Sequence, residues 1–250
     1  MAHEILTEGI VLRRWYAGEY DKWVSFLTPE HGKLRVRVRG ARKPKSKMGM
    51  LTEPLNLLRA RVIEGKAQHL IVQPQLTRSY VRVRGDLERL SVALALCETL
   101  DRWLPDEQVE SEAYTVLIVA LEALEGGVVV EHAAAWALWR WLALLGYSPE
   151  LSQCAACGKT FDRSGAVLSP TAGALLCPPC APPGEGVALP ADAVQLLQQW
   201  TQGERLSIVA CPEACGLLAR AALRYAECVL ETPVRWLEFW ERLSALRESG

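Results

Sequence analysis

The spacing of the hydrophobic residues changes near residue 80, and this change divides the chain into two parts of different structure. Before it, apolar and charged residues alternate, as in the stretch LRVRVR at 34–39. A period of two predicts a β-strand with one buried face and one solvated face. After it, apolar residues recur at the spacing of a helix. We therefore expect a multi-domain α+β protein.

The first 80 residues predict a small β-barrel. Turn sequences such as PEHG at 29–32 separate short runs of apolar and β-branched residues. The expected strands are 5–15, 22–28, 33–40, 55–63 and 69–72. Five short strands are typical of an OB-type barrel, so we expect residues 1–80 to form an OB-fold domain.

The remainder predicts a helical domain with an insert. Prolines and glycines bound its apolar-periodic segments, which predict helices over 86–104, 107–124, 130–145, 190–202, 213–231 and 233–247. We expect residues 81–147 and 184–250 to form the α-helical domain. Residues 148–183 are then an insert that contains half of the eight cysteines.

Two Cys-x2-Cys pairs, 19 residues apart, predict a metal site in this insert. They are Cys154 and Cys157, followed by Cys177 and Cys180. Zinc prefers four tetrahedral ligands and binds thiolates well. The segment between the pairs predicts a hairpin too small to be stable without metal, so we expect one structural zinc ion. Redox-active pairs are the alternative, but the βαβ pattern around such motifs is absent. The other cysteines, Cys97, Cys211, Cys215 and Cys228, lie in apolar helical contexts that predict core packing.

Positive charge is concentrated in residues 32–47, which we call the basic segment. The chain has a net charge of −1, yet residues 1–80 carry 15 Lys and Arg against 7 Asp and Glu, whereas residues 81–250 carry 13 against 22. The basic segment has no acid and eight cations: Lys33, Arg35, Arg37, Arg39, Arg42, Lys43, Lys45 and Lys47. We expect its arginines to share one strand face and residues 40–47 to project as a loop. This pattern predicts contacts with nucleic-acid phosphates, although a solvated edge strand or attraction between the two halves are alternatives.

Aromatic residues in the same part of the chain complete a candidate nucleic-acid surface. Trp15, Tyr16, Tyr20 and Trp23 are candidates for stacking on bases, or for filling the barrel interior. The sequence has no phosphate-binding loop, zinc-protease motif or nucleophile elbow, so we expect no enzyme activity. No long apolar run predicts a membrane span, and the amino-terminal residues do not predict a signal peptide. We therefore expect a cytoplasmic protein.

Five segments make the chain resemble the RecO family of bacterial recombination mediators. They are EGIVLRR (8–14), GEYDK (18–22), FLTPEHGKL (26–34), RGARKPKS (39–46) and LTEPLNLL (51–58). The four cysteines within a helical domain also resemble family members that carry a zinc module. The resemblance implies a non-enzymatic DNA repair protein that binds single- and double-stranded DNA and anneals complementary strands. Together with RecR, such a protein helps to load RecA onto DNA coated by the single-stranded DNA-binding protein (SSB).

The resemblance also implies further contacts and leaves other functions open. The eight cations of the basic segment are the expected DNA contacts. Some RecO proteins bind the SSB tail through the helical domain, where Arg140 is a candidate anchor, although its tryptophan-rich surroundings are more typical of a core. An RNA- or ribosome-associated OB protein with a zinc ribbon fits the same motifs. A scaffold that binds an acidic partner, or a nuclease with an unrecognised site, are further alternatives.

Overall fold

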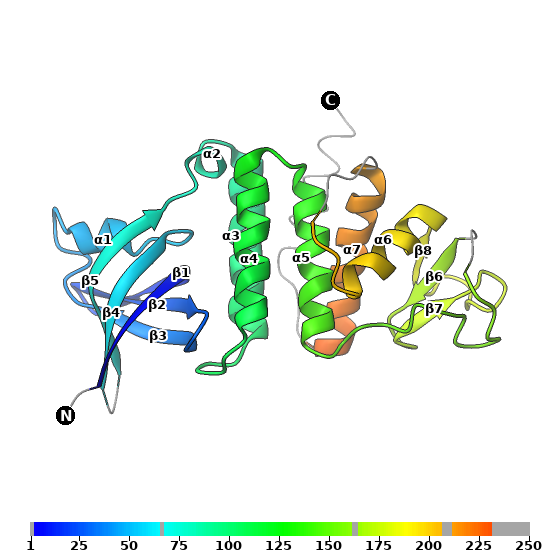
Figure 1. Ribbon diagram of the computed structural model, residues 1–250, viewed down its shortest axis with the longest axis horizontal. Coiled ribbons are helices and arrows are strands. Elements are labelled where there is room, and N and C mark those ends of the chain that lie inside the picture. Colours follow the sequence, from blue (N-terminus) through cyan, green and yellow to red (C-terminus); the bar gives the residue numbers. More distant parts are fainter. Residues whose placement is uncertain (1–2, 66–67, 162–164, 207–211, 232–250) are drawn as a thin grey trace. The chain divides into compact units, whose positions relative to one another are not determined.

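The computed structural model describes residues 3–65, 68–161, 165–206 and 212–231 and divides the chain into two compact units (Figure 1). The units are Met1–Gly126 and Gly127–Gly250. The first contains the barrel together with three of the following helices, and the second contains the remaining helices and the cysteine module. The expected domain boundaries after residues 80, 147 and 183 remain predictions.

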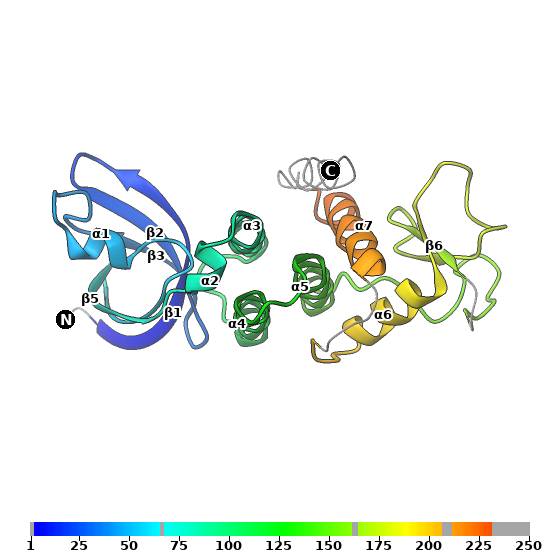
Figure 2. The ribbon, with the colours of Figure 1, turned by 90° about the horizontal axis from the view of Figure 1, so that it is seen from above.

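Five strands form a closed barrel in the first unit (Figures 1 and 2). They are β1 (His3–Ala17), β2 (Asp21–Thr28), β3 (Gly32–Val38), β4 (Leu57–Glu64) and β5 (His69–Arg78). Their order is β1-β2-β3-β5-β4, and β1 also pairs with β4, which closes the barrel. Every pairing is antiparallel except that of β3 with β5. The structure thus confirms the predicted OB-type barrel followed by a helical region.

The barrel interior contains the apolar faces that the alternation predicted. Leu34, Val36 and Val38 are buried there with Val24 and Phe26. The short helix α1 (Lys47–Leu51) lies in the β3–β4 connection and packs Met48 against this core. The basic segment therefore runs from a barrel strand into the start of a helix that the sequence did not predict.

Three helices follow the barrel within the first unit, and α3 and α4 lie side by side (Figure 2). They are α2 (Val81–Arg84), α3 (Leu87–Trp103) and α4 (Ser111–Gly126). The Asp86 side chain accepts a hydrogen bond from the Arg89 backbone N–H and so caps the amino terminus of α3. The predicted helix start at residue 107 is wrong. Glu107 has a φ of 62° and donates its backbone N–H to the Lys33 carbonyl, which keeps the α3–α4 connection out of helical geometry.

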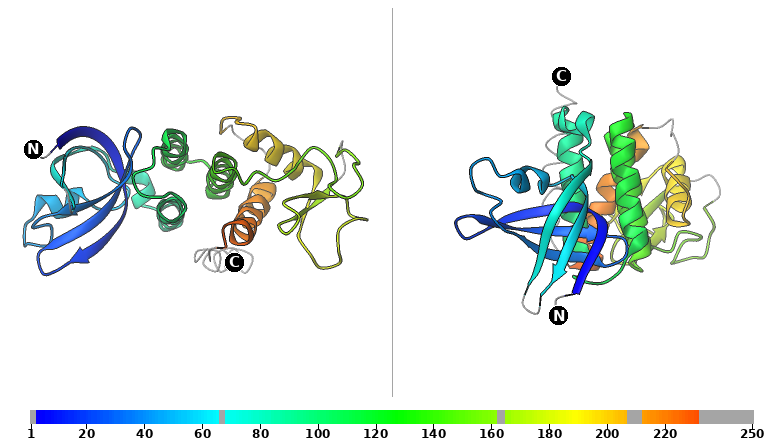
Figure 3. Two further views of the ribbon diagram at one scale, coloured as in Figure 1. Left: turned by 90° about the horizontal axis from the view of Figure 1, so that it is seen from below. Right: turned by 60° about the vertical axis from the view of Figure 1, so that its left-hand side comes forward.

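In its described residues, the second unit combines three helices with a small sheet (Figures 1 and 3). Its elements are α5 (Val130–Leu144), β6 (Ala166–Ser169), β7 (Ala174–Leu176), β8 (Val187–Leu189), α6 (Ala191–Thr201) and α7 (Pro212–Leu230). The sheet order is β7-β6-β8. The predicted helix over 233–247 and Cys211 lie outside the described residues. None of the described helices is long and apolar enough to cross a membrane.

The tryptophan-rich helix α5 forms part of the core of this unit, as predicted. Trp139 and Trp141 are fully buried, and Trp136 is nearly so. The Trp139 indole N–H donates to the Leu218 carbonyl of α7 at 3.0 Å. Arg140 donates to the Trp200 carbonyl at 3.3 Å, so it also contributes to the contact between α5 and α6.

Candidate nucleic-acid interface and metal site

Lys33, the first cation of the basic segment, is buried and has a structural role. Only 3% of its side chain is exposed, and its ammonium lies 3.1 Å from the Asp106 carboxylate. The same ammonium donates to the Asp101 carbonyl at the end of α3. Although the alternation places Lys33 on the outer face of β3, the α3–α4 connection covers that end of the strand. Lys33 is therefore removed from the set of predicted DNA contacts.

The next two arginines face outward, as predicted, but each is paired with a carboxylate. The Arg35 Nε lies 2.6 Å from Asp106 Oδ2, and the Arg37 Nε lies 2.8 Å from Asp21 Oδ2. More than half of the Arg35 side chain is exposed, whereas about a third of Arg37 is. A phosphate would have to compete with these acids for the two guanidinium groups.

The five remaining cations follow the end of β3 and are exposed to solvent. They are Arg39, Arg42, Lys43, Lys45 and Lys47. Among the described residues, none of the salt bridges involves any of these five. Instead of the freely projecting loop that the sequence suggested, residues 40–46 form hydrogen-bonded turns. The Arg42 backbone N–H donates to the Tyr20 carbonyl at 2.9 Å, which holds the turns against the β1–β2 hairpin.

Beside these turns lies a cavity of about 360 Å³ that Tyr16, Arg42, Lys43 and Lys45 help to line. The Arg42 guanidinium lies 4.3 Å from the centre of the Tyr16 ring and donates to the Gly18 carbonyl at 2.6 Å. Tyr16 is 63% exposed. A guanidinium that is held over an aromatic ring is pre-positioned for a phosphate or for a base face.

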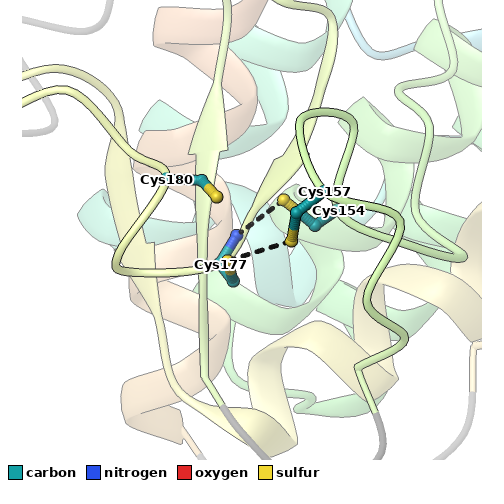
Figure 4. Close-up of side chains that lie close together, drawn as sticks. All are labelled: Cys154, Cys157, Cys177 and Cys180. Carbon is teal, nitrogen blue, oxygen red and sulfur yellow. Dashed lines mark hydrogen bonds between the residues drawn. The ribbon is translucent and has the colours of Figure 1, made fainter.

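The four predicted metal ligands come together in the second unit. All four sulfur atoms lie within 4.8 Å of one another, and Cys157 Sγ lies 3.7 Å from Cys177 Sγ. Figure 4 shows the two pairs on separate loops, with their sulfur atoms turned toward a common point. Tetrahedral thiolates about 2.3 Å from a zinc ion are separated by about 3.8 Å, so the spacing fits zinc. The arrangement can hold a metal ion, whereas its four thiols leave no position for a substrate.

Hydrogen bonds within the cluster shift the pKa values of its thiols in opposite directions. The Cys177 backbone N–H donates to Cys154 Sγ at 3.3 Å and lowers the pKa of Cys154 to about 6. Hydrogen bonds with the Cys177 and Cys157 thiols raise the pKa of Cys180 to about 12. Four adjacent sulfurs cannot all ionise without a positive charge between them, and a divalent cation supplies that charge.

The cysteine module has only a small apolar core of its own. Cys154, Leu176 and Cys177 are buried in it, and Phe161 packs against them. The predicted hairpin between the two pairs is formed by β6 and β7. Gly158 adopts a φ of 73° directly after the second ligand, a backbone conformation that favours glycine. A core this small fits a fold that a metal ion holds together.

Comparison with known proteins identifies the family. Residues 1–80 match the family described as Recombination protein O N terminal, and residues 84–237 match Recombination protein O C terminal. This chain belongs to the RecO family. The two RecO family matches meet at residues 80–84, close to the change in hydrophobic period.

Proteins named DNA repair protein RecO are similar to most of the chain. The protein from Symbiobacterium thermophilum is 29% identical over 247 residues, which span 96% of this chain and 98% of that protein. The protein from Nocardioides sp. is 32% identical over 205 residues, spanning 79% and 82%. The protein from Roseiflexus sp. is 35% identical over 175 residues, which span 70% of this chain and 62% of the Roseiflexus protein.

Two cations near the basic segment of this RecO family member were missed by sequence reasoning. Arg14 and Lys22 line the same cavity as Arg42. Lys22 is buried and donates to Glu53 at 2.9 Å, while Arg14 bonds Glu53 at 2.7 Å. The pairing of β1 with β2 brings both residues close to Tyr16, because Tyr16 lies opposite Lys22. Strand alternation alone could not reveal this, because the pairing shifts register between Val11 and Arg13.

Proposed function

We propose that this protein is a DNA repair and recombination mediator that binds single- and double-stranded DNA and anneals complementary strands. With RecR, it would help to load RecA onto DNA coated by SSB, acting in the cytoplasm at the nucleoid. This proposal takes its partners from the RecO resemblance and its DNA contact from the basic segment.

The observation that carries the proposal is the group of exposed cations after β3: Arg39, Arg42, Lys43, Lys45 and Lys47. Hydrogen bonds fix the turns that present them, so the charges have a defined surface before any ligand binds. Phosphates release condensed counterions when lysine and arginine neutralise them, which favours binding to any sequence. Arg35 and Arg37 extend the same surface along β3, at the cost of breaking their pairs with Asp106 and Asp21.

Annealing follows from the same electrostatics. Two DNA strands repel each other, and a surface that neutralises the phosphates of both lowers the free energy needed to bring them together. The contacts are to phosphate and sugar, so little sequence preference is expected. No bond is made or broken by the protein, so the proposed activity requires no catalytic group.

The four-cysteine cluster is proposed to bind one structural zinc ion. Its sulfur spacing and small core support a role in folding the module that connects β6 and β7 to the helices. The Gln198 side chain donates to the Leu151 carbonyl at 2.7 Å and so attaches this module to α6.

A strand-annealing assay, with and without SSB, tests the proposed function. The triple variant Arg39→Ala, Arg42→Ala and Lys43→Ala should anneal complementary oligonucleotides at least tenfold more slowly, since three phosphate contacts are lost. The matched control replaces Arg59, Arg82 and Arg89, three arginines of the same unit outside the basic segment. Equal rates for the triple variant and the wild type would contradict the proposal.

A further inference from the structure

A second cavity opens on the outer face of the barrel, close to the basic segment. Its volume is about 610 Å³, within the range of ligand sites in proteins. We call it the tryptophan cleft, because Trp15 of β1 and Trp23 of β2 line its strand side. The two residues are directly opposite each other in the β1–β2 register, and both are half-buried. They provide neighbouring aromatic surfaces on one face of a rigid sheet.

The polar groups around the cleft suit the edge of a nucleobase better than a phosphate. Asp106 and Glu107 line one side and carry carboxylates that repel phosphate. Gln68 contributes an amide, which is both a donor and an acceptor. The Arg35 guanidinium lies 5.8 Å from the centre of the Trp15 ring, and Asp106 holds it there. Donors and acceptors around an aromatic surface match the flat face and polar edge of a base.

The cleft is continuous with the proposed phosphate surface. Trp23 pairs across the sheet with Arg37, and the Arg37 guanidinium donates to the Gln68 side chain at 3.3 Å. Gln68 thus touches the cleft and an arginine of the basic segment at once. A single DNA strand whose phosphates lie along the basic segment would have its bases within reach of Trp15 and Trp23.

We propose that the tryptophan cleft binds unpaired nucleobases, with Trp15 and Trp23 as stacking surfaces. The proposal rests on the proposed binding of DNA by the basic segment and adds to it a contact that only a single strand offers. In a duplex, bases are stacked on their neighbours and their pairing edges are occupied, so they cannot enter the cleft. The cleft therefore distinguishes single strands from duplexes, whereas the exposed cations do not.

An abasic strand separates base binding from phosphate binding. We would measure the affinity for a deoxycytidine oligonucleotide of about 16 nucleotides, and for an abasic oligonucleotide of equal length. The wild type should bind the deoxycytidine strand about tenfold more tightly, because stacking adds to the phosphate contacts. The double variant Trp15→Leu and Trp23→Leu should bind both strands equally, with its affinity for the abasic strand unchanged. Tyr147→Leu, at an exposed aromatic of the second unit outside the cleft and the basic segment, is the control and should retain the difference.

Equal wild-type affinity for the two strands would overturn the base-binding proposal, as would a difference that survives the double variant or is lost in Tyr147→Leu. If the double variant does not fold, the single variants Trp15→Phe and Trp23→Phe replace it. Each should reduce the difference, and an unchanged difference in both would overturn the proposal. Failure of the proposed DNA binding has another signature, since the wild type would then bind neither strand.

Discussion

The Asp21 carboxylate holds the Arg37 guanidinium with two contacts, at 2.8 Å from Nε and 2.7 Å from Nη2. Its other oxygen accepts the Gly40 backbone N–H at 2.7 Å. That N–H and the nearby Arg37 together lower the pKa of Asp21. Asp21 therefore shapes the turn that begins the exposed part of the basic segment. If the basic segment binds DNA as proposed, Asp21 would also compete with DNA for Arg37.

We predict that Asp21→Asn strengthens DNA binding. Asparagine can still accept the Gly40 N–H, but its side chain has no charge to neutralise Arg37. An ion pair that is partly accessible to solvent contributes little, so the affinity for single-stranded DNA should rise about threefold, as measured by fluorescence anisotropy. Glu112→Gln in α4 causes the same change of net charge and should leave the affinity nearly unchanged. Weaker binding by folded Asp21→Asn would show that the acid does not compete.

Lys33 and Lys43 should respond differently to the same substitution. Lys33→Met removes the charged partner of Asp106 and the donor to Asp101, so the free energy of unfolding should fall by about 1–3 kcal/mol. Lys43→Met, at an exposed position, should change it by less than about 0.5 kcal/mol but weaken DNA binding. Urea denaturation and DNA titration distinguish the two effects. A stable Lys33→Met variant with impaired DNA binding would restore Lys33 to the interface.

Metal content should depend on the cysteine cluster alone. Protein purified without chelator should contain one zinc ion per chain, and the double variant Cys177→Ser and Cys180→Ser should contain none, because half of the ligands are lost. Elemental analysis measures both. Cys228, which is exposed although core packing was predicted, provides the control Cys228→Ser, which should retain the metal. A full complement of zinc in the double variant would refute the site.

Acid sensitivity is predicted for the second unit from His132. The imidazole is buried and stacked on Trp200 at 5.6 Å between ring centres, and burial lowers its pKa. As the pH falls below about 6.5, His132 of the unfolded chain binds a proton, whereas His132 of the folded chain stays neutral until the pH reaches its lower pKa. The contribution of neutral His132 to the free energy of unfolding is therefore present above about pH 6.5 and is lost as the pH falls through the folded pKa.

Thermal unfolding between about pH 7 and about pH 5 tests this expectation. His132→Phe keeps a ring against Trp200 but cannot bind a proton, so its melting temperature should fall less than that of the wild type over this interval. His31→Gln, on the turn between β2 and β3, should behave like the wild type. Equal pH dependence of wild type and His132→Phe would exclude His132 as the cause.

Short-range patterns predicted the barrel strands and the cysteine cluster because both depend on local spacing. The alternation at 34–38 is sufficient to place Leu34 and Val36 inside, and each Cys-x2-Cys turn brings its own two sulfurs together. The burial of Lys33 could not be predicted in this way, since an alternation with a period of two identifies a face of the strand but not the segment that covers that face. The helix start at 107 failed for the same reason, because a tertiary contact with Lys33 outweighs helical periodicity.

The tryptophan cleft also required three-dimensional information. Trp15 and Trp23 were candidates for base stacking, but their pairing depends on a register shift in β1 that no local pattern reveals. The facing acids Asp106 and Glu107 come from a connection more than eighty residues later in the sequence. The sequence thus identifies the aromatic residues, whereas the cleft that they line is visible only in the structure.

The salt dependence of DNA affinity tests the central claim most directly. Affinity for a single-stranded oligonucleotide would be measured at several salt concentrations for the wild type and for the triple variant Arg42→Ala, Lys43→Ala and Lys45→Ala. Five exposed cations predict that log affinity falls against log salt with a slope of about −3.5, and loss of three should flatten it to about −1.4. A slope that is the same in both proteins would contradict the assignment of the basic segment as the DNA-binding surface.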